Sequence, residues 1–419
     1  MNFISIYNWV ETFCYHFRNK DTGEVLNLLQ ELLENAHNNP KSTRINDKKE
    51  EFRQRCHTIA YGVFRDHSVD TQELADFFFH ISKALESYNA HEYSQGFTAF
   101  NDAYSCFTRL FKQQEGIWLL GPMKHLTRHL RIYATLAYNQ TQNESFIVTS
   151  INSVRNLVSL MNLSKAAPAV SKRRGLVFCA KELGYMCFKI WKYSDCSKNI
   201  EDAEKFLRLP EIRSSDFSKS DLVALKYYEG RVALFDFHFV RAEHCLEEAF
   251  NKSHKNAFKN QRTILKYLIP AKVYCGKLPT VELIQKYKLF EYVLLVKAIN
   301  EGNLSLYRAQ IEKYRRIWIK RSIYLALEKL ELILLRNLMK RVYNLFKKPI
   351  IDTDSFKIAL NHGMKEVQYD IDETECIISN LILKGFIKGY ISHDKRKVVF
   401  SKNDPFPKIS KLIENGIIN

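Results

Sequence analysis

Apolar residues recur at three- and four-residue steps almost throughout this chain, and this period constrains its fold more than any other feature. An early example is the stripe formed by Val25, Leu28, Leu29, Leu32 and Leu33. Such spacing places apolar side chains on one face of a helix. The 419 residues include only 14 Gly and 9 Pro, too few for a β-rich fold with many tight turns. The pattern predicts a mainly α-helical protein.

The helical pattern is interrupted by polar stretches that we interpret as boundaries. The segment 164–175 lacks the apolar period and contains Pro168, so we expect a division there. The predicted parts are an N-terminal helical region over 1–163, helical-pair repeats over 164–350, a winged helix over 351–407 and a C-terminal tail over 408–419.

A helical-pair repeat signal lies within residues 226–249. Tetratricopeptide pairs carry small residues where their two antiparallel helices approach closely. At the expected offsets stand Gly230, Ala242, Leu246 and Ala249. The positions of the usual Trp and Leu carry charged residues, and no second copy follows after about 34 residues. We therefore expect a right-handed array of irregular TPR-like helical pairs, whose concave face suits binding more than catalysis.

The last part of the chain changes character. Two short helices are predicted over 354–364 and 373–384, and Gly385 stands where a glycine would end the second helix. Residues 386–392 and 397–402 have strand composition around a polar turn. Two helices followed by a basic two-stranded hairpin are typical of a winged helix.

Charge and cysteine content narrow the class of protein. Lys and Arg number 63 and Asp and Glu 46, giving a net charge of +17, which favours a polyanionic partner. The nine cysteines include no Cys-x-x-Cys pair, so we expect core thiols in a reducing compartment rather than disulfides or zinc. No stretch approaches the ~18 apolar residues of a membrane span, and the first residues do not read as a signal peptide. These features indicate a basic, soluble, intracellular protein.

The segment 300–348 is strongly basic, with twelve Lys or Arg against four acidic residues. If its second half is one continuous helix, six apolar side chains form a buried stripe, and basic side chains form a line on another face. The stripe consists of Ile323, Leu327, Leu330, Leu334, Leu338 and Leu345. The basic line consists of Lys329, Arg336, Lys340 and Lys347, and a face of the preceding helix carries Lys313, Arg316 and Lys320.

We expect these cations to hold nucleic-acid phosphates, together with Lys395, Arg396 and Lys397 of the wing. The alternative is that they are ordinary solvated helix faces. The helix in the recognition position of the winged helix opens with the acidic residues Asp370, Asp372, Glu373 and Glu375. Acidic groups suit a helix N-terminus but repel phosphates, so little base recognition is expected.

The winged helix has a second, compatible interpretation as a protein interface. Val398, Val399 and Phe400 are predicted to form an apolar edge strand that could pair with another chain.

The sequence motifs that would indicate catalysis are weak. His125 and His129 are spaced like a metal pair, but neighbouring arginines oppose a cation, and no third ligand is evident. We expect no enzymatic activity, no cofactor and no metal site.

Several stretches carry a family resemblance. They are Tyr227–Arg231, Leu268–Lys272, Leu278–Leu283, Ala298–Leu304, Leu381–Gly385, Lys388–His393 and Asn403–Pro407. Helical pairs followed by a C-terminal winged helix resemble the PCI family of the proteasome lid, the signalosome and initiation factor three. The stretches are similar to the branch with the signalosome subunit-twelve-like proteins and the PCI subunit of the nuclear transcription-export complex.

The resemblance implies a non-catalytic scaffold in the nucleus and cytoplasm. It implies pairing with a second PCI protein of the Sac/GANP type and with a small acidic DSS-type protein, and binding of RNA or DNA in mRNA splicing or export. We expect the acidic protein to lie on the basic region that begins with Lys172, Arg173 and Arg174, where Glu182 is the only acid up to residue 192. An association with the signalosome is also implied. The alternative is a pure signalosome scaffold that regulates cullin deneddylation without binding nucleic acid.

Overall fold

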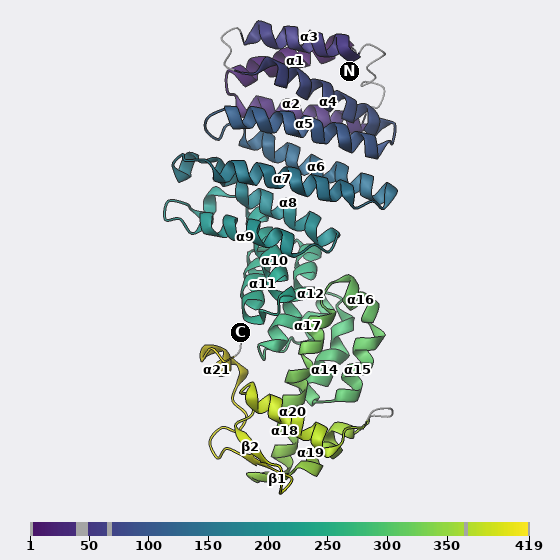
Figure 1. The fold of residues 1–419 in the computed structure, drawn as a ribbon, viewed down its shortest axis with the longest axis vertical. Coiled ribbons are helices and arrows are strands. Elements are labelled where there is room, and N and C mark those ends of the chain that lie inside the picture. The colour runs from purple at the N-terminus through teal and green to yellow at the C-terminus, as the bar shows by residue number, and fades with distance from the viewer. Residues whose placement is uncertain (1–2, 39–48, 65–68, 364–367, 418–419) are drawn as a thin grey trace. The chain divides into compact units, whose positions relative to one another are not determined.

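The computed structural model describes residues 3–38, 49–64, 69–363 and 368–417, and its described chain is mainly helical (Figure 1). The chain divides into two compact units, Met1–Leu225 and Lys226–Asn419. The predicted boundary at 163/164 lies between two helices of the first unit, and the division at 225/226 falls within a helix. No described helix is long and apolar enough to cross a membrane.

The first unit is a succession of long helices packed on their neighbours. They are α1 (Phe3–Arg18), α2 (Thr22–Asn38), α3 (Lys49–Val63), α4 (Thr71–Asn89), α5 (Tyr93–Gln113), α6 (Leu120–Thr141), α7 (Ser145–Asn162), α8 (Leu176–Lys189) and α9 (Ser194–Leu207). Aromatic side chains fill much of this core; the rings of Phe100 and Tyr133 stack with centroids 4.6 Å apart. The helical pattern read from the sequence is confirmed in the described part of the unit.

Helix α10 (Lys219–Phe235) runs across the division, and the second unit continues with α11 (Phe239–Lys252) and α12 (Phe258–Tyr274). An added Cβ on Gly230 would lie 2.5 Å from Cγ of Leu246, so α10 and α11 meet at a glycine. Ala242, Leu246 and Ala249 are fully buried. The close helical pair predicted from these residues is confirmed.

Six further α-helices complete the described array of the second unit before the winged helix. They are α13 (Val281–Lys286), α14 (Val293–Glu301), α15 (Leu304–Lys313), α16 (Arg315–Lys320), α17 (Tyr324–Lys329) and α18 (Glu331–Phe346). Gly302 has a φ of 65° and its missing Cβ would lie 2.7 Å from the backbone of Leu338, so α14 turns directly beneath α18. Asn303 then caps α15, its side chain accepting from the amide of Leu306 at 2.9 Å.

A winged helix lies in the C-terminal part of the chain, as predicted. It contains β1 (Ile350–Asp352), α19 (Thr353–Asn361), α20 (Ile371–Leu383), β2 (Gly389–Ser392) and β3 (Lys397–Phe400). The segment 408–419, predicted to be a tail, contains the short helix α21 (Ile409–Glu414), whose Ile409 and Leu412 are buried. The helices match the predicted ranges closely, and Gly385 ends α20 with a φ of 75°. Residue 364, the last of the first predicted helix, lies outside the described part of the chain.

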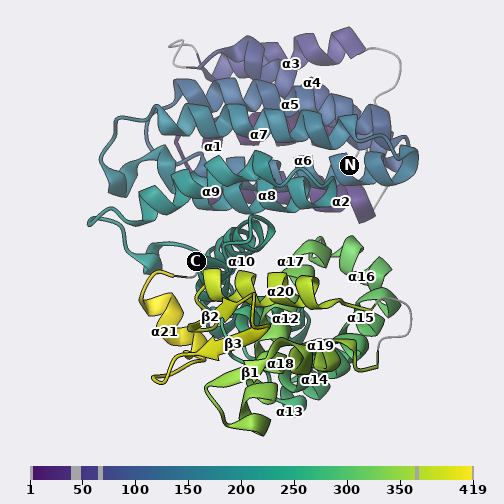
Figure 2. The ribbon, with the colours of Figure 1, turned by 60° about the horizontal axis from the view of Figure 1, so that its bottom comes forward.

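The sheet differs from the prediction in one respect. It has three strands in the order β1-β3-β2, and Figure 2 shows β3 between the other two. Strand β1 was not predicted, because its three residues are too few to show a period. The strand of Val398, Val399 and Phe400 is therefore central, and its prediction as an edge strand is wrong. Val398 and Phe400 face the core, where Phe400 packs on Phe406 with centroids 5.5 Å apart.

Candidate nucleic-acid and partner interface

The predicted basic line does not lie on one helix. The chain bends between α16 and α17, where Ser322 has a φ of 59°, and Leu330 separates α17 from α18. The predicted apolar stripe nevertheless continues across Leu330, because Ile323, Leu327, Leu330 and Leu334 are all buried. Leu345, placed in the buried stripe, is 81% exposed, although Leu334 is fully buried as predicted.

Arg336 is the clearest exception within the basic line. It is only 6% exposed, and one of its terminal nitrogens donates to the carbonyl oxygens of Pro407 at 2.6 Å and Phe406 at 3.3 Å. Burial away from water lowers the pKa of this guanidinium from its usual value. Its prediction as an exposed phosphate ligand is wrong in geometry, because Arg336 fastens the end of the winged helix to α18.

The other cations of the region lie at the surface. Lys340 and Lys347 are exposed on α18 and at its C-cap, and Lys329 is exposed with its Nζ 5.5 Å from the ring of Phe237. Lys313, Arg316 and Lys320 are also exposed, but the first ends α15 while the others belong to α16. Surface position is what phosphate binding requires; the role itself stays a prediction.

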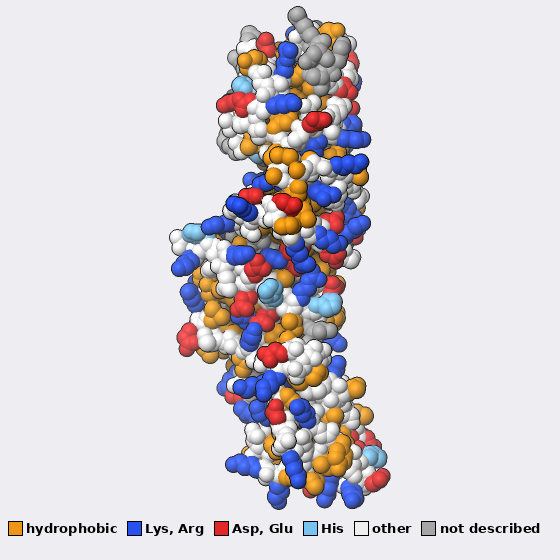
Figure 3. Space-filling view, turned by 90° about the vertical axis from the view of Figure 1, so that its left-hand side faces the viewer, with side chains coloured by type: hydrophobic (Ala, Val, Ile, Leu, Met, Phe, Trp, Pro, Cys, Tyr) orange, Lys and Arg blue, Asp and Glu red, His pale blue; other side chains and the backbone are white. Residues whose placement is uncertain are grey.

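Figure 3 shows how charge is distributed on one face of the molecule. Lys and Arg side chains alternate with Asp and Glu there, rather than gathering into one confluent patch. At the bottom of this view, Lys and Arg side chains lie next to exposed hydrophobic side chains. A binding surface for a polyanion would therefore combine charge with apolar contact.

The wing cations differ from one another in their partners. Arg396 contacts the carboxylates of Asp372 and Glu375, the latter at 3.2 Å, on the helix in the recognition position. Lys397 has its Nζ 3.9 Å from Asp352, and Lys395 is exposed in the turn. Hydrogen bonds and charge from Asp372 raise the pKa of Arg396 above its usual value. The wing therefore pairs with two of the four acids at the start of α20, while Asp370 and Glu373 bond to backbone amides in the capping box of the helix.

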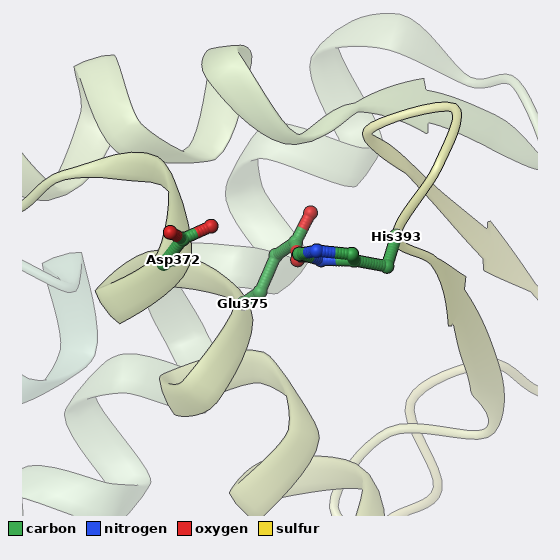
Figure 4. A group of neighbouring side chains, drawn as sticks. All are labelled: Asp372, Glu375 and His393. Atoms are coloured by element: carbon green, nitrogen blue, oxygen red, sulfur yellow. The ribbon is translucent and has the colours of Figure 1, made fainter.

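Asp372, Glu375 and His393 form a cluster that could in principle hold a metal ion (Figure 4). Their candidate ligand atoms lie within 4.8 Å of one another, and His393 Nδ1 is 2.6 Å from a carboxylate oxygen of Glu375. Nη1 of Arg396, however, also lies 3.3 Å from His393 Nδ1. The guanidinium stands where a metal cation would bind, so the cluster is an internal ion-pair network.

Lys172, Arg173 and Arg174, the basic run of the first unit, also bond to groups within that unit. Nζ of Lys172 donates to the carbonyl oxygen of Phe111 at 2.6 Å, and Arg173 donates to that of Asn162 at 3.1 Å. Arg174 pairs with Asp216 at 3.6 Å. Burial lowers the pKa of Lys172, since the charged form loses hydration. The three residues are half-buried, so they offer an acidic partner less charge than the sequence indicates.

The histidine pair that is spaced like a metal site belongs to the core. His125 and His129 are buried on α6, with ring centroids 4.5 Å apart. Eight of the nine cysteines are buried, and burial raises the pKa of Cys179 to about 12, which keeps this thiol protonated and unreactive. These side chains pack the core, as predicted for most of the cysteines.

The solvent-facing side of the sheet is not indicated by the sequence. Ile350 is 51% and Tyr390 is 63% exposed, although both belong to strands. Tyr390 and its neighbour Ile391 are both apolar, so β2 carries no alternation of polar and apolar residues that would show which of them faces the solvent. The outer side chains can be identified only from the pairing of β3 with β1 and β2.

Comparison with known proteins places this geometry in a family. The PCI domain matches residues 311–402, from the end of α15 to the residues after β3. The chain is 35% identical over 340 residues to PCI domain-containing protein 2 of Xenopus laevis, covering 79% of this chain and 83% of that protein. The chain belongs to the PCI family.

Two further relatives indicate the branch. The chain is 29% identical over 362 residues to Enhanced ethylene response protein 5 of Arabidopsis thaliana, covering 84% of this chain and 86% of that protein. It is 30% identical over 269 residues to Protein CSN12 homolog of Neurospora crassa, covering 60% of this chain and 59% of that protein. The predicted branch of the PCI family is confirmed, and membership supports a scaffold role in assemblies of PCI proteins.

Proposed function

We propose that this chain is a non-catalytic scaffold subunit that helps to form a nucleic-acid-binding platform. Its partners are a second PCI protein of the Sac/GANP type and a small acidic DSS-type protein. The platform acts in mRNA processing, in transcription-coupled splicing or export, in the nucleus and cytoplasm. The same subunit associates with the signalosome.

One observation carries the nucleic-acid part of this proposal. The winged helix and the helix that leads into it expose Lys340, Lys347, Lys395 and Lys397, while Arg396 pairs with only Asp372 and Glu375 of the four acids that open the recognition-position helix. Exposed lysines without a groove-reading helix favour contact with phosphates over contact with base edges. We therefore expect affinity for unrelated sequences and strong dependence on salt.

A salt titration of RNA binding tests this function. The complex reconstituted with its PCI partner is titrated with labelled RNAs of unrelated sequence between low and physiological salt. Each phosphate contact contributes about 0.7 to the slope of log affinity against log salt for a single strand. Changing Lys340, Lys347 and Lys395 to Gln should lower the affinity for all RNAs equally and flatten the slope by about two.

The control is Lys205→Gln, an exposed lysine on α9, which should leave both affinity and slope unchanged. A complex without salt-dependent binding would instead support the alternative, a pure scaffold of the signalosome that regulates cullin deneddylation.

The acidic partner is proposed to lie on the basic middle region of the chain. Reversing Lys172, Arg173 and Arg174 would also break their internal bonds, so the sharper test changes the exposed Lys165 and Lys192 to Glu. Loss of co-purification of the acidic protein, with unchanged thermal unfolding, is the expected result.

A further inference from the structure

The three strands of the winged helix pair in a register that aligns side chains across the sheet. Ile350 pairs with Val399, and Val399 pairs with Tyr390. Residues directly opposite in antiparallel strands point to the same face. Val398 and Ile351, one position away, are buried beneath the sheet. Ile350, Val399 and Tyr390 therefore form one apolar row on the outer face, which we call the outer row.

Lysines flank the outer row on both sides. On one side, Lys397 points to the same face two residues from Val399, which corresponds to about 6.8 Å of strand. On the other side, the amide of Ser401 donates to the carbonyl of Lys388 at 2.8 Å, so the register continues beyond β2. Lys388 and Lys348 are both exposed at that end. The face is thus apolar along its middle and cationic at the margin of Lys348 and Lys388, whereas at the other margin Lys397 pairs with Asp352, which lies opposite it in β1.

This layout matches the chemistry of an unpaired nucleic-acid strand. Bases present flat apolar faces that stack on aromatic rings, and phosphates at the outside of the strand attract lysines. A duplex hides the base faces within its stack, so it could use only the lysines. The recognition-position helix is a poorer site, because its start carries four acidic residues, of which Arg396 pairs with only two.

We propose that the outer face of this sheet binds a single strand of nucleic acid, with Tyr390 stacking on a base and Lys348, Lys388 and Lys397 holding phosphates. This inference rests on the proposed function and goes further, because it names unpaired strands as the ligand and places them on the outer face of the sheet. It also gives Tyr390 a role, base stacking, that differs from the electrostatic role of the surrounding lysines.

The test measures fluorescence anisotropy of labelled 12-nucleotide oligouridylate and of a 12-base-pair RNA duplex, using the full chain in its complex. Tyr390→Ala should weaken single-strand binding about tenfold, within the range for loss of one stacked base, and should change duplex binding little. Tyr390→Phe keeps the ring and should bind like the wild type. Photo-crosslinking of the single strand followed by mass spectrometry should mark residue 390.

The matched control is Ile358→Ala on α19, because this side chain is also apolar and 63% exposed but does not lie on the sheet. It should bind both RNAs like the wild type. Since Tyr390 is 63% exposed, its replacement should leave thermal unfolding unchanged.

Three outcomes would overturn the proposal. If Tyr390→Ala keeps its single-strand affinity while the pair Lys348→Gln and Lys388→Gln loses it, the face binds by charge alone, and the proposed function stands without stacking. If Tyr390→Ala loses only the PCI partner in a pull-down, the face is a protein interface. If the wild-type complex shows no salt-dependent binding at all, both this inference and the nucleic-acid function fail.

Discussion

At the scale of single residues, charge counted along a sequence says little about charge offered to a ligand. Arg336 and Lys340 are four positions apart on α18, yet the first is buried against the carbonyls of Phe406 and Pro407 and the second is exposed. The partner carbonyls lie about seventy positions away along the chain. A pattern in the sequence around Arg336 therefore could not predict these hydrogen bonds.

Arg336→Met tests this structural role. Removing the guanidinium leaves two carbonyl oxygens without their donor. A hydrogen bond from a charged group contributes about 1.5–3 kcal/mol to the stability of a fold. We expect the free energy of unfolding to fall by about 2 kcal/mol in urea titrations. Lys340→Met, the matched exposed change, should alter it by less than about 0.5 kcal/mol. Equal stability of the two variants would contradict the assignment.

Glu229 gives a prediction about pH. It is 5% exposed and accepts from Lys226 at 2.9 Å and Arg241 at 3.0 Å. Burial acts to raise the pKa of this carboxyl, but the two cations more than offset burial, so the pKa lies below its usual value. A carboxyl whose pKa is lower in the folded state stabilises the fold above its unfolded pKa and loses this effect as pH falls.

Glu229→Gln should therefore lower the free energy of unfolding at pH 7, and the difference from wild type should shrink as the pH falls below about 4.3. Denaturant titrations at several pH values measure this difference. The control is Glu312→Gln, whose side chain is 69% exposed in its ion pair with Arg315, and it should show almost no difference at any pH. A Glu229→Gln deficit that does not change with pH would rule out the charged form as its source.

At the scale of elements, period and small residues were sufficient for the helices but not for the sheet. The stretch around Gly230 predicted a close helical pair, because the contact partners Ala242, Leu246 and Ala249 follow within one hairpin. Strand β1 pairs with residues almost fifty positions later, so its three residues carried no signal of their own. For the same reason the central position of β3 and the outer row could not be foreseen.

Gly230→Ala tests the close pair. The new methyl group would lie 2.5 Å from Cγ of Leu246 and 3.2 Å from its backbone nitrogen, so one helix must shift. Overpacking of this kind costs about 1–3 kcal/mol, which a thermal melt would detect. Gly62→Ala on α3 has nothing within 4 Å and should be neutral or stabilising, as expected for alanine in a helix. Similar melts for both variants would contradict the close approach.

At the scale of the whole molecule, the two units have their own cores. A change confined to one core should therefore lower local stability mainly within that unit. Hydrogen exchange of Gly230→Ala, followed by mass spectrometry, should show faster exchange in residues 226–419. Protection of α4 and α5, in the first unit, should stay the same. Uniformly faster exchange in both units would indicate that the chain opens as one cooperative body.

The hydrogen bonds of Arg336 also determine when the winged helix can fold during synthesis. Ribosomes add about 5–20 residues each second, so α18 is made about 4–14 s before the carbonyls of Phe406 and Pro407 exist. During that interval the guanidinium of Arg336 has neither of these acceptors. Strand β1 likewise has no partner until β3 has been made. The winged helix can close only after Phe406 and Pro407 have been added to the chain. A partner that binds the completed module would thus engage only chains that extend past these residues, and ribosome stalling shortly before residue 406 would yield chains that it does not recognise.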